Sequence, residues 1–527
     1  MQTHTLDSTW LNVGTRRQFF FDDLMLDQAQ DVTRRHHHPQ RVSDEPLIKA
    51  DRPWEHVTYF TCNTWNVIRD PADGLFKCWY EDWMIDDPSK AKFYVRQTDG
   101  KICVDAHAQW PSRLCYAQSE DGLHWEKPPL GIVRENGHDT NIVLGGESIG
   151  MVHCAYVLLD GADPDPNRRF KAMFEQRRMA GDDNAGAARF AMATSPDGLR
   201  WSISDRTVRF GPFEVMGDVV TISRDPESKV YWTNNRHPDM CSITVHDRRK
   251  PCQHSWLSPV YRHEIAGENR RRVYRSQSVD LFDWSTPQPL VVPESDADNI
   301  DDAFYGMEQF QAGDDWIGLL NVLHMADNTM EVQLAHARDG IRFQRVRPGE
   351  AWLGPRPGDA WDRTMVTICS KPVEVGDDLF VYHAGASNHH DWWFVGTAEG
   401  LAVPETGNLD HVNYAMGLAK IKKDRFVSIG SGDAREGLIV TPALRTKGGR
   451  LLINAVTRPG GAVRVAVADG QDIVHEGFEH TNCVALEGDA VSHEVKWNGQ
   501  NELPPGEMRK LHIYLRKADI FSFEFCE

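Results

Sequence analysis

The sequence predicts an all-β protein that folds as a five-bladed β-propeller followed by a β-sandwich. The first observation behind this prediction is a repeated segment in which charged turn residues lead into an aromatic, β-rich run. A strand unit that recurs along a chain indicates a radial array of blades. Because the segment occurs five times, we expect five blades. The copies begin at Asp73, Arg169, Ser228, Asp314 and Asp377.

An apolar run precedes each copy and is expected to form the innermost strand of its blade. Runs of β-forming residues without strict alternation are typical of strands that are buried on both faces. The turn and the aromatic run then complete a hairpin, and two more strands give four per blade. The apolar runs cover residues 65–68, 152–157, 218–222, 305–310 and 364–368.

The second observation is a turn built on an aspartate and an aromatic residue, of the kind called an Asp-box in sialidase-like propellers. The aspartate can bind the backbone of its own turn, a glycine adopts positive φ, and the aromatic ring covers the hairpin. We therefore expect these aspartates to be structural and place no catalysis on them. They are Asp121, Asp197, Asp280 and Asp339.

The third observation is a change of pattern near residue 435, after which short alternating strands are separated by Gly, Pro, Asn and Asp turns. Such strands fit a small β-sandwich. The sequence therefore predicts lead-in strands over 1–50, a propeller domain over 51–430 and a sandwich over 431–527.

Composition excludes several classes of partner. The 527 residues carry a formal net charge of −19, which repels nucleic acid and anionic lipid. No apolar run approaches the length of a membrane span, and no secretory signal stands at the N-terminus, so we expect a cytoplasmic protein. The ten cysteines are scattered singly and are expected to be buried, reduced thiols rather than zinc ligands.

Several segments resemble glycoside hydrolases of the family 32 and 43 type, and in particular a bacterial group described as family-32 N-terminal-domain-like. The resemblance rests on the repeats and on Phe21-Asp22-Asp23, Arg52–Glu55 and Phe304–Met307. It implies a glycoside hydrolase acting on a furanoside, such as a fructo- or arabinofuranoside, in a short oligosaccharide. The invertase nucleophile motif and its Glu-Cys acid motif are absent, and Arg69-Asp70-Pro71 is interpreted as a turn.

Hydrolysis of a glycosidic bond needs two carboxyl groups, one as acid and one as base or nucleophile. In a propeller we expect them where the innermost strands begin, at the mouth of the central axis. Glu81, Asp82 and Glu175 end second strands and should reach the same mouth. Asp301 and Asp302 precede the fourth blade, and Asp302 is the better placed. The leading candidates are Asp218, Glu55, Asp302 and Glu308.

Other side chains near the strand ends are expected to bind the sugar. Arg236 could hold Asp218 ionised or grip the substrate. His324, His383, His389 and the adjacent His390 could bind hydroxyls or hold a divalent cation such as calcium near the axis. Trp83, Trp392 and Trp393 offer stacking platforms.

Two alternatives keep the fold and change the function. A glycoside phosphorylase or a lyase is one, and Arg177, Arg178 and Arg236 would supply the basic cluster that a phosphorylase needs. A non-catalytic carbohydrate-binding protein is the other, because a fold does not dictate a function. The sequence leaves a homo-oligomer open.

Overall fold

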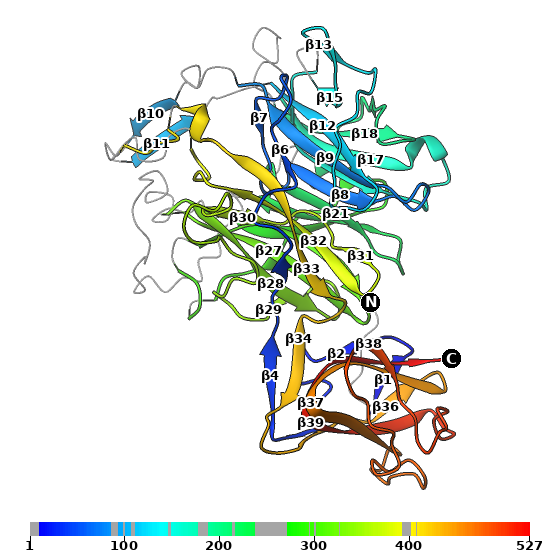
Figure 1. Ribbon diagram of the computed structural model, residues 1–527. Helices are drawn as coiled ribbons and strands as arrows, with labels where there is room; N and C mark the ends of the chain where they lie inside the picture. The colour runs from blue at the N-terminus through cyan, green and yellow to red at the C-terminus, as the bar shows by residue number, and fades with distance from the viewer. Residues whose placement is uncertain are drawn as a thin grey trace.

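The computed structural model describes residues 10–85, 93–98, 101–106, 111–145, 149–177, 188–212, 217–237, 271–294, 296–299, 302–325, 327–392, 402–406 and 408–527. These residues form strands almost throughout, arranged as a large unit and a smaller C-terminal unit (Figure 1). The helical segments described are short 3-10 turns, such as Pro166–Arg168 and Leu409–His411. Nowhere in the described chain is a helix long and apolar enough to cross a membrane.

The large unit is the predicted five-bladed propeller. Each blade is an antiparallel sheet whose strands follow one another outward from the axis. Blade one holds β7 (Val57–Thr58), β8 (Trp65–Arg69), β9 (Phe76–Trp83), β12 (Ser112–Ser119) and β15 (Ile142–Gly145). Blade two holds β16 (Met151–Leu159), β17 (Phe170–Arg177), β18 (Ala188–Ser195) and β19 (Ser202–Ile203). Blade three holds β21 (Val220–Arg224), β22 (Tyr231–His237), β23 (Arg272–Ser278) and β25 (Gln288–Val291).

The last two blades are joined by a parallel pairing at Met330 and Met365. Blade four holds β26 (Asp302–Ala312), β27 (Asp315–His324), β28 (Thr329–Ala337) and β29 (Gln344–Arg345). Blade five holds β30 (Met365–Thr367), β31 (Val373–Val375), β32 (Asp378–Ala386) and β33 (Tyr414–Lys422). Its outermost position is filled by β5 (Gln40–Arg41) and β6 (Ile48–Lys49), which pair with β33.

The N-terminal segment therefore has a role that its polar composition did not indicate. The sequence predicted lead-in strands over residues 1–50 but not the strands they pair with, and β5 and β6 complete the fifth blade by pairing with β33. The physical reason is the exposed edge of β33, whose backbone groups need partners. Pairing the two ends of the propeller in one sheet also ties the ring closed.

Hydrogen bonds between neighbouring innermost strands show that the ring is complete. Asn66 of blade one donates to the carbonyl of Val157 of blade two at 2.8 Å. Ser370, which follows β30 of blade five, donates to the carbonyl of Val67 of blade one at 3.0 Å. Similar bonds join Asp160 to Arg224, Thr221 to Met307, and Asn321 to Ile368.

The C-terminal unit is the predicted β-sandwich, built on two long strands that pair over most of their length. These are β37 (Arg450–Ala468) and β39 (Met508–Cys526), and their register shifts between Thr457 and Ala462. The shift allows them to bend and serve both layers around a core that includes Trp497. The remaining strands are β1 (Leu11–Gly14), β2 (Gln18–Phe19), β3 (Gln28–Gln30), β4 (Val32–His36), β34 (Val427–Ser431), β35 (Gly437–Val440), β36 (Leu444–Thr446) and β38 (Asp489–Glu494).

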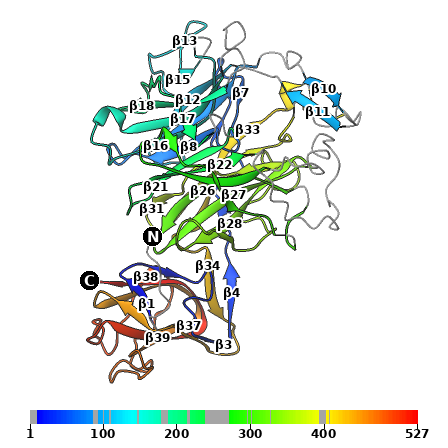
Figure 2. The same cartoon turned by 180° about the vertical axis from the view of Figure 1, so that it is seen from behind.

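The sandwich thus takes strands from both ends of the chain. Figures 1 and 2 show β4 and β34 running side by side between the two units. Phe19 and Phe21 of the N-terminal segment also pack into a cluster with blades four and five. The division of the chain at residues 50 and 430 stays a prediction about domains.

The predicted structural role of the Asp-box turns is confirmed. In all four turns the aspartate Oδ1 accepts two backbone N–H groups at 2.8–3.0 Å. They lie where the third strand of each blade ends, opposite the mouth. The described cysteines for which a bonding state is given are free thiols, most of them buried, as predicted.

Candidate active site

A chain of charged side chains crosses the mouth from blade one to blade three. Glu81 ends β9, His153 lies near the start of β16, and Asp218 precedes β21. His153 Nδ1 lies 2.9 Å from Glu81 Oε1, and its Nε2 lies 3.4 Å from Asp218 Oδ2. Arg236, on β22, donates from Nη2 to Asp218 Oδ1. The structure therefore brings the predicted residues Asp218 and Arg236 together and joins them to Glu81.

The backbone of β16 is shaped to place His153 in this chain. Cys154, the next residue, has a φ of +51°, and the register with β17 shifts between His153 and Tyr156. A positive φ is uncommon for a residue other than glycine and marks a local bulge. Glu81 fixes this turn, because its carboxylate accepts the Cys154 N–H at 3.0 Å and the Trp83 indole N–H at 2.6 Å.

The electrostatics of the chain keep Asp218 ionised. Burial opposes its charge, but Arg236 and His153 outweigh burial and hold the pKa of Asp218 well below its usual range. Burial likewise opposes a charged His153, yet the adjacent Cys154, Glu81 and Asp218 hold the pKa of His153 well above its usual range. The imidazolium therefore sits between two carboxylates. Of these two residues Asp218 is the more accessible to solvent, since its side chain is 23% exposed while that of His153 is 9% exposed.

A second carboxylate lies beside Asp218. Glu175, near the end of β17, offers an oxygen that lies with an Asp218 oxygen and a His153 nitrogen in a group whose atoms are all within 4.8 Å of one another. Such a mixed set of nitrogen and oxygen ligands could hold a divalent cation. The same group places two carboxylates side by side next to a histidine, which is also the arrangement that acid–base chemistry needs.

Blade four supplies one wall of the site. The guanidinium carbon of Arg236 lies 4.1 Å from the ring centre of Tyr305, and that of Arg271 lies 4.9 Å from it. The Tyr305 hydroxyl lies 2.8 Å from Nε2 of His390. Burial lowers the pKa of His390 to about 4, so its ring is neutral. Among the histidines that the sequence suggested for sugar binding, His390 contacts Tyr305 of this wall.

Three of the four leading carboxylate candidates, Glu55, Asp302 and Glu308, bind side chains other than those of the Glu81–His153–Asp218 chain. Glu55 accepts Lys127 Nζ at 2.7 Å and the Tyr80 hydroxyl at 2.6 Å, and its side chain is fully buried. Asp302 lies 2.7 Å from His324 Nδ1 and accepts the Asn299 N–H. With its partners Asp302 and Glu331, His324 has a pKa raised to about 10 despite its burial.

Glu308 occupies the propeller axis rather than the mouth. It lies on β26 and accepts the hydroxyl of Tyr156 from blade two at 2.8 Å and the N–H of Gln309 at 2.9 Å. Glu308 is fully buried, and this burial raises its pKa to about 7. The carboxyl therefore joins blades on opposite sides of the axis.

The predicted sugar-binding residues are dispersed. His383 is buried and stacks on Trp361 at 5.6 Å, and burial lowers its pKa to about 3. His389 pairs with Glu405, Trp392 is fully buried, and Trp83 stacks on Tyr59 at 3.9 Å. The residues Asp301, Arg178 and Trp393 lie outside the described part of the chain, as does the side chain of Arg177.

Sequence reasoning missed His153 and Tyr305. Both stand within apolar strands, where a polar side chain has to find a partner or a role. The run Val152–Val157 carries this signal, because His153 is the polar residue within it. Asp82, another strand-end acid, is tied to Arg113 at 3.0 Å.

Comparison with known proteins shows distant structural similarity. No protein-family model and no curated protein sequence matches this chain. An N-acetylgalactosamine deacetylase from F. plautii is 13% identical, with coverage of 75% of this chain and 97% of that chain and a TM-score of 0.43. A glycosyl hydrolase from Bacteroides ovatus is 13% identical, with coverage of 74% and 95% and a TM-score of 0.41. The Bombyx mori GH32 beta-fructofuranosidase BmSUC1 is 10% identical, with coverage of 90% and 94% and a TM-score of 0.35. Similarities this distant do not bear on activity.

Proposed function

We propose that the protein is a glycoside hydrolase in which Asp218 and Glu175 are the two catalytic carboxyl groups. The observation that carries this proposal is their approach within 4.8 Å at the mouth of the propeller. Retaining glycosidases place their carboxyl groups about 5–5.5 Å apart, whereas inverting enzymes need about 6.5–9.5 Å to admit a water molecule. Because one oxygen of each carboxylate lies within 4.8 Å of the other, we expect retention of the anomeric configuration.

The environment of Asp218 suits a nucleophile. Arg236 and His153 keep it ionised, and its partial exposure gives a sugar carbon access to the free lone pairs. Asp218 attacks the anomeric carbon and forms a covalent glycosyl-enzyme, while the leaving oxygen takes a proton from Glu175. Glu175 then removes a proton from water, which attacks the same carbon and releases Asp218.

Arg236 and His153 position the nucleophile in this proposal. Within the described residues, Nε and Nη1 of Arg236 are buried and have no hydrogen-bond partner. A neutral glycoside, with a furanoside as the expected class, fits a site whose own charges are already paired.

The test is a product analysis by proton NMR with a panel of furanosides and pyranosides. We expect cleavage of at least one class, with the first-formed sugar retaining its anomeric configuration. The Asp218→Asn variant should lose turnover and keep sugar binding. Inverted product would remove Asp218 from the role of nucleophile. Cleavage that requires inorganic phosphate would indicate a phosphorylase instead, and binding without any cleavage would indicate a carbohydrate-binding protein.

A further inference from the structure

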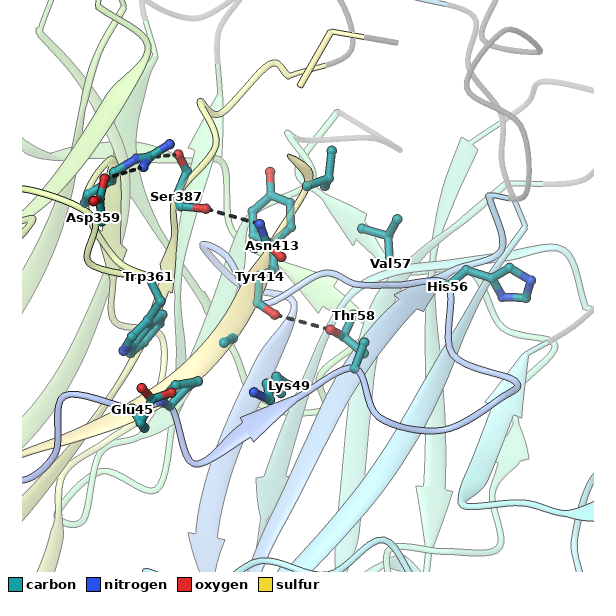
Figure 3. Close-up of a pocket in the computed structure, with 15 residues that line it drawn as sticks. Glu45, Lys49, His56, Val57, Thr58, Asp359, Trp361, Ser387, Asn413 and Tyr414 are labelled. Carbon is teal, nitrogen blue, oxygen red and sulfur yellow. Dashed lines mark hydrogen bonds and ion pairs between the residues drawn. The ribbon is translucent and has the colours of Figure 1, made fainter. Parts of the chain in front are cut away.

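A pocket of about 360 Å³ lies at the seam between blade five and blade one, and we name it the seam pocket. Its walls come from β6, β7, the start of β33 and the loop before β30. In Figure 3, Trp361 lies on one side of the pocket and Val57, Thr58 and Lys49 on the other, with Asn413 and Tyr414 between them. This volume lies within the range of about 300–1,000 Å³ that small-molecule sites occupy.

The seam pocket is linked to the mouth by a series of contacts that begins at Tyr414. Tyr414 lines the pocket, and its ring meets Tyr59 edge-on with centres 4.9 Å apart. Tyr59 stacks on Trp83, whose indole is bound to Glu81 of the charged chain. The Tyr414 hydroxyl also lies 3.5 Å from the carbonyl of His390. A row of aromatic rings, Tyr414, Tyr59 and Trp83, therefore runs from the seam pocket to the charged chain of the candidate active site.

The polar atoms of the seam pocket are weakly engaged. Asn413 Nδ2 contacts Ser387 Oγ at 3.3 Å, and Thr58 Oγ1 contacts the Tyr414 carbonyl at 3.3 Å. Both distances exceed those of strong hydrogen bonds, so a ligand hydroxyl can replace them. Among the described residues, the Glu45 carboxylate and the Lys49 ammonium have no hydrogen bond or ion pair.

The lining has the chemistry of a sugar site rather than of an ion site. Two acids, Glu45 and Asp359, balance two bases, Lys49 and Arg363. Trp361 is half-buried and rests on the neutral His383 ring, which holds the indole in place as a platform. An aromatic face with hydroxyl, amide and charged hydrogen-bonding groups around it matches a neutral polar ring.

We propose that the seam pocket binds a segment of a neutral oligosaccharide whose reacting end occupies the mouth. This inference rests on the proposed function and sharpens it, because it makes the substrate a chain longer than a disaccharide. Binding there adds affinity that depends on chain length and leaves the chemistry at Asp218 and Glu175 unchanged.

The test measures binding by calorimetry in the Asp218→Asn protein, with neutral fructo- and arabino-oligosaccharides from disaccharide to pentasaccharide. We expect the affinity to rise about five- to tenfold along the series that binds, the value of a stacked ring with one or two added hydrogen bonds. Ala50 is exposed and lines the pocket, so Ala50→Trp should fill it and abolish this rise. The matched control is Ala434→Trp, at an exposed position in the sandwich, which should keep the rise.

A second variant guards against misfolding of the first. Asn413→Ala removes one exposed hydrogen-bonding group and should reduce the rise about two- to fivefold, with an unchanged unfolding midpoint. If both pocket variants keep the full increase of affinity with chain length, or if affinity does not depend on chain length at all, the seam pocket does not bind the oligosaccharide. The proposed function is unaffected by either result. Absence of both binding and cleavage with every saccharide overturns the proposed function and the seam pocket together.

Discussion

Asp218 and Asp302 occupy equivalent positions in neighbouring blades, and the structure treats them differently. Each precedes or begins the innermost strand of its blade, and each binds a cationic side chain on the second strand, Arg236 or His324. Asp302 is 2% exposed and is tied within blade four, whereas Asp218 is 23% exposed and also reaches His153 of blade two. Exposure to solvent therefore distinguishes Asp218, the candidate nucleophile, from Asp302, which is buried in an ion pair with His324.

We expect the largest effect when the candidate nucleophile is removed. Asp218→Asn removes the anion that attacks the anomeric carbon, so kcat/KM should fall about 10³-fold or more. Steady-state kinetics on the best glycoside of the panel measures this fall. A loss of less than about tenfold would exclude Asp218 from the chemistry.

The partner carboxyl offers the next largest effect. Glu175→Gln removes the proton donor, so kcat/KM on a natural glycoside should fall about 10²–10³-fold. Aryl glycosides with acidic leaving groups need little protonation and should lose much less. An equal loss on both kinds of substrate would contradict the role of Glu175 as acid.

A substitution of Glu308 tests whether a carboxyl group in the propeller axis affects stability rather than catalysis. Burial raises the pKa of Glu308 from its usual 4.5 to about 7, so the folded state binds the extra proton and stability falls as pH rises from about 4.5 to 7. Glu308→Gln keeps a partner for Tyr156 and cannot ionise. Its free energy of unfolding relative to the natural chain should therefore increase by up to about 3 kcal/mol between pH 4.5 and 8. Urea unfolding across this range measures the difference, and a pH-independent difference would show that Glu308 is not protonated in the fold.

Asp302→Asn tests the other half of the comparison with Asp218, namely that Asp302 stabilises the fold and takes no part in catalysis. His324 has a folded pKa of about 10, raised above its usual 6.5, so the stability that it provides is complete below pH 6.5 and is lost as pH rises towards 10. Removing Asp302 should cost about 2–3 kcal/mol at pH 6 and much less at pH 10. Chemical denaturation at the two pH values measures this, and kcat of the folded protein should stay near that of the natural chain. A loss of turnover comparable to that of Asp218→Asn would return Asp302 to the active site.

The smallest effect concerns the Asp-box turns at the opposite end of the blades. Asp197→Ala leaves two backbone N–H groups of its turn without their acceptor, so thermal unfolding should show a loss of about 1–2 kcal/mol. Turnover should not change. A specific loss of activity at constant stability would mean that this face takes part in function.

Local pattern predicted the architecture well, because each blade repeats the same sequence elements within a short stretch of chain. The number of blades, the sandwich and the structural role of the Asp-box turns followed from strand periodicity and turn chemistry. The candidate site was predicted only in part. Asp218 and Arg236 are at the mouth as expected, whereas Glu55 lies against Lys127 and Glu308 in the axis.

The sequence by itself determined which segments become strands and turns, since these depend on neighbours a few residues away. Only the tertiary structure decided which strand ends meet. His153 stands between Glu81 and Asp218 because three blades converge at the mouth, and β5 completes blade five because the edge of β33 needs a partner. Both contacts join residues far apart in the chain, where side-chain direction and register, rather than local composition, set the distance between charged groups.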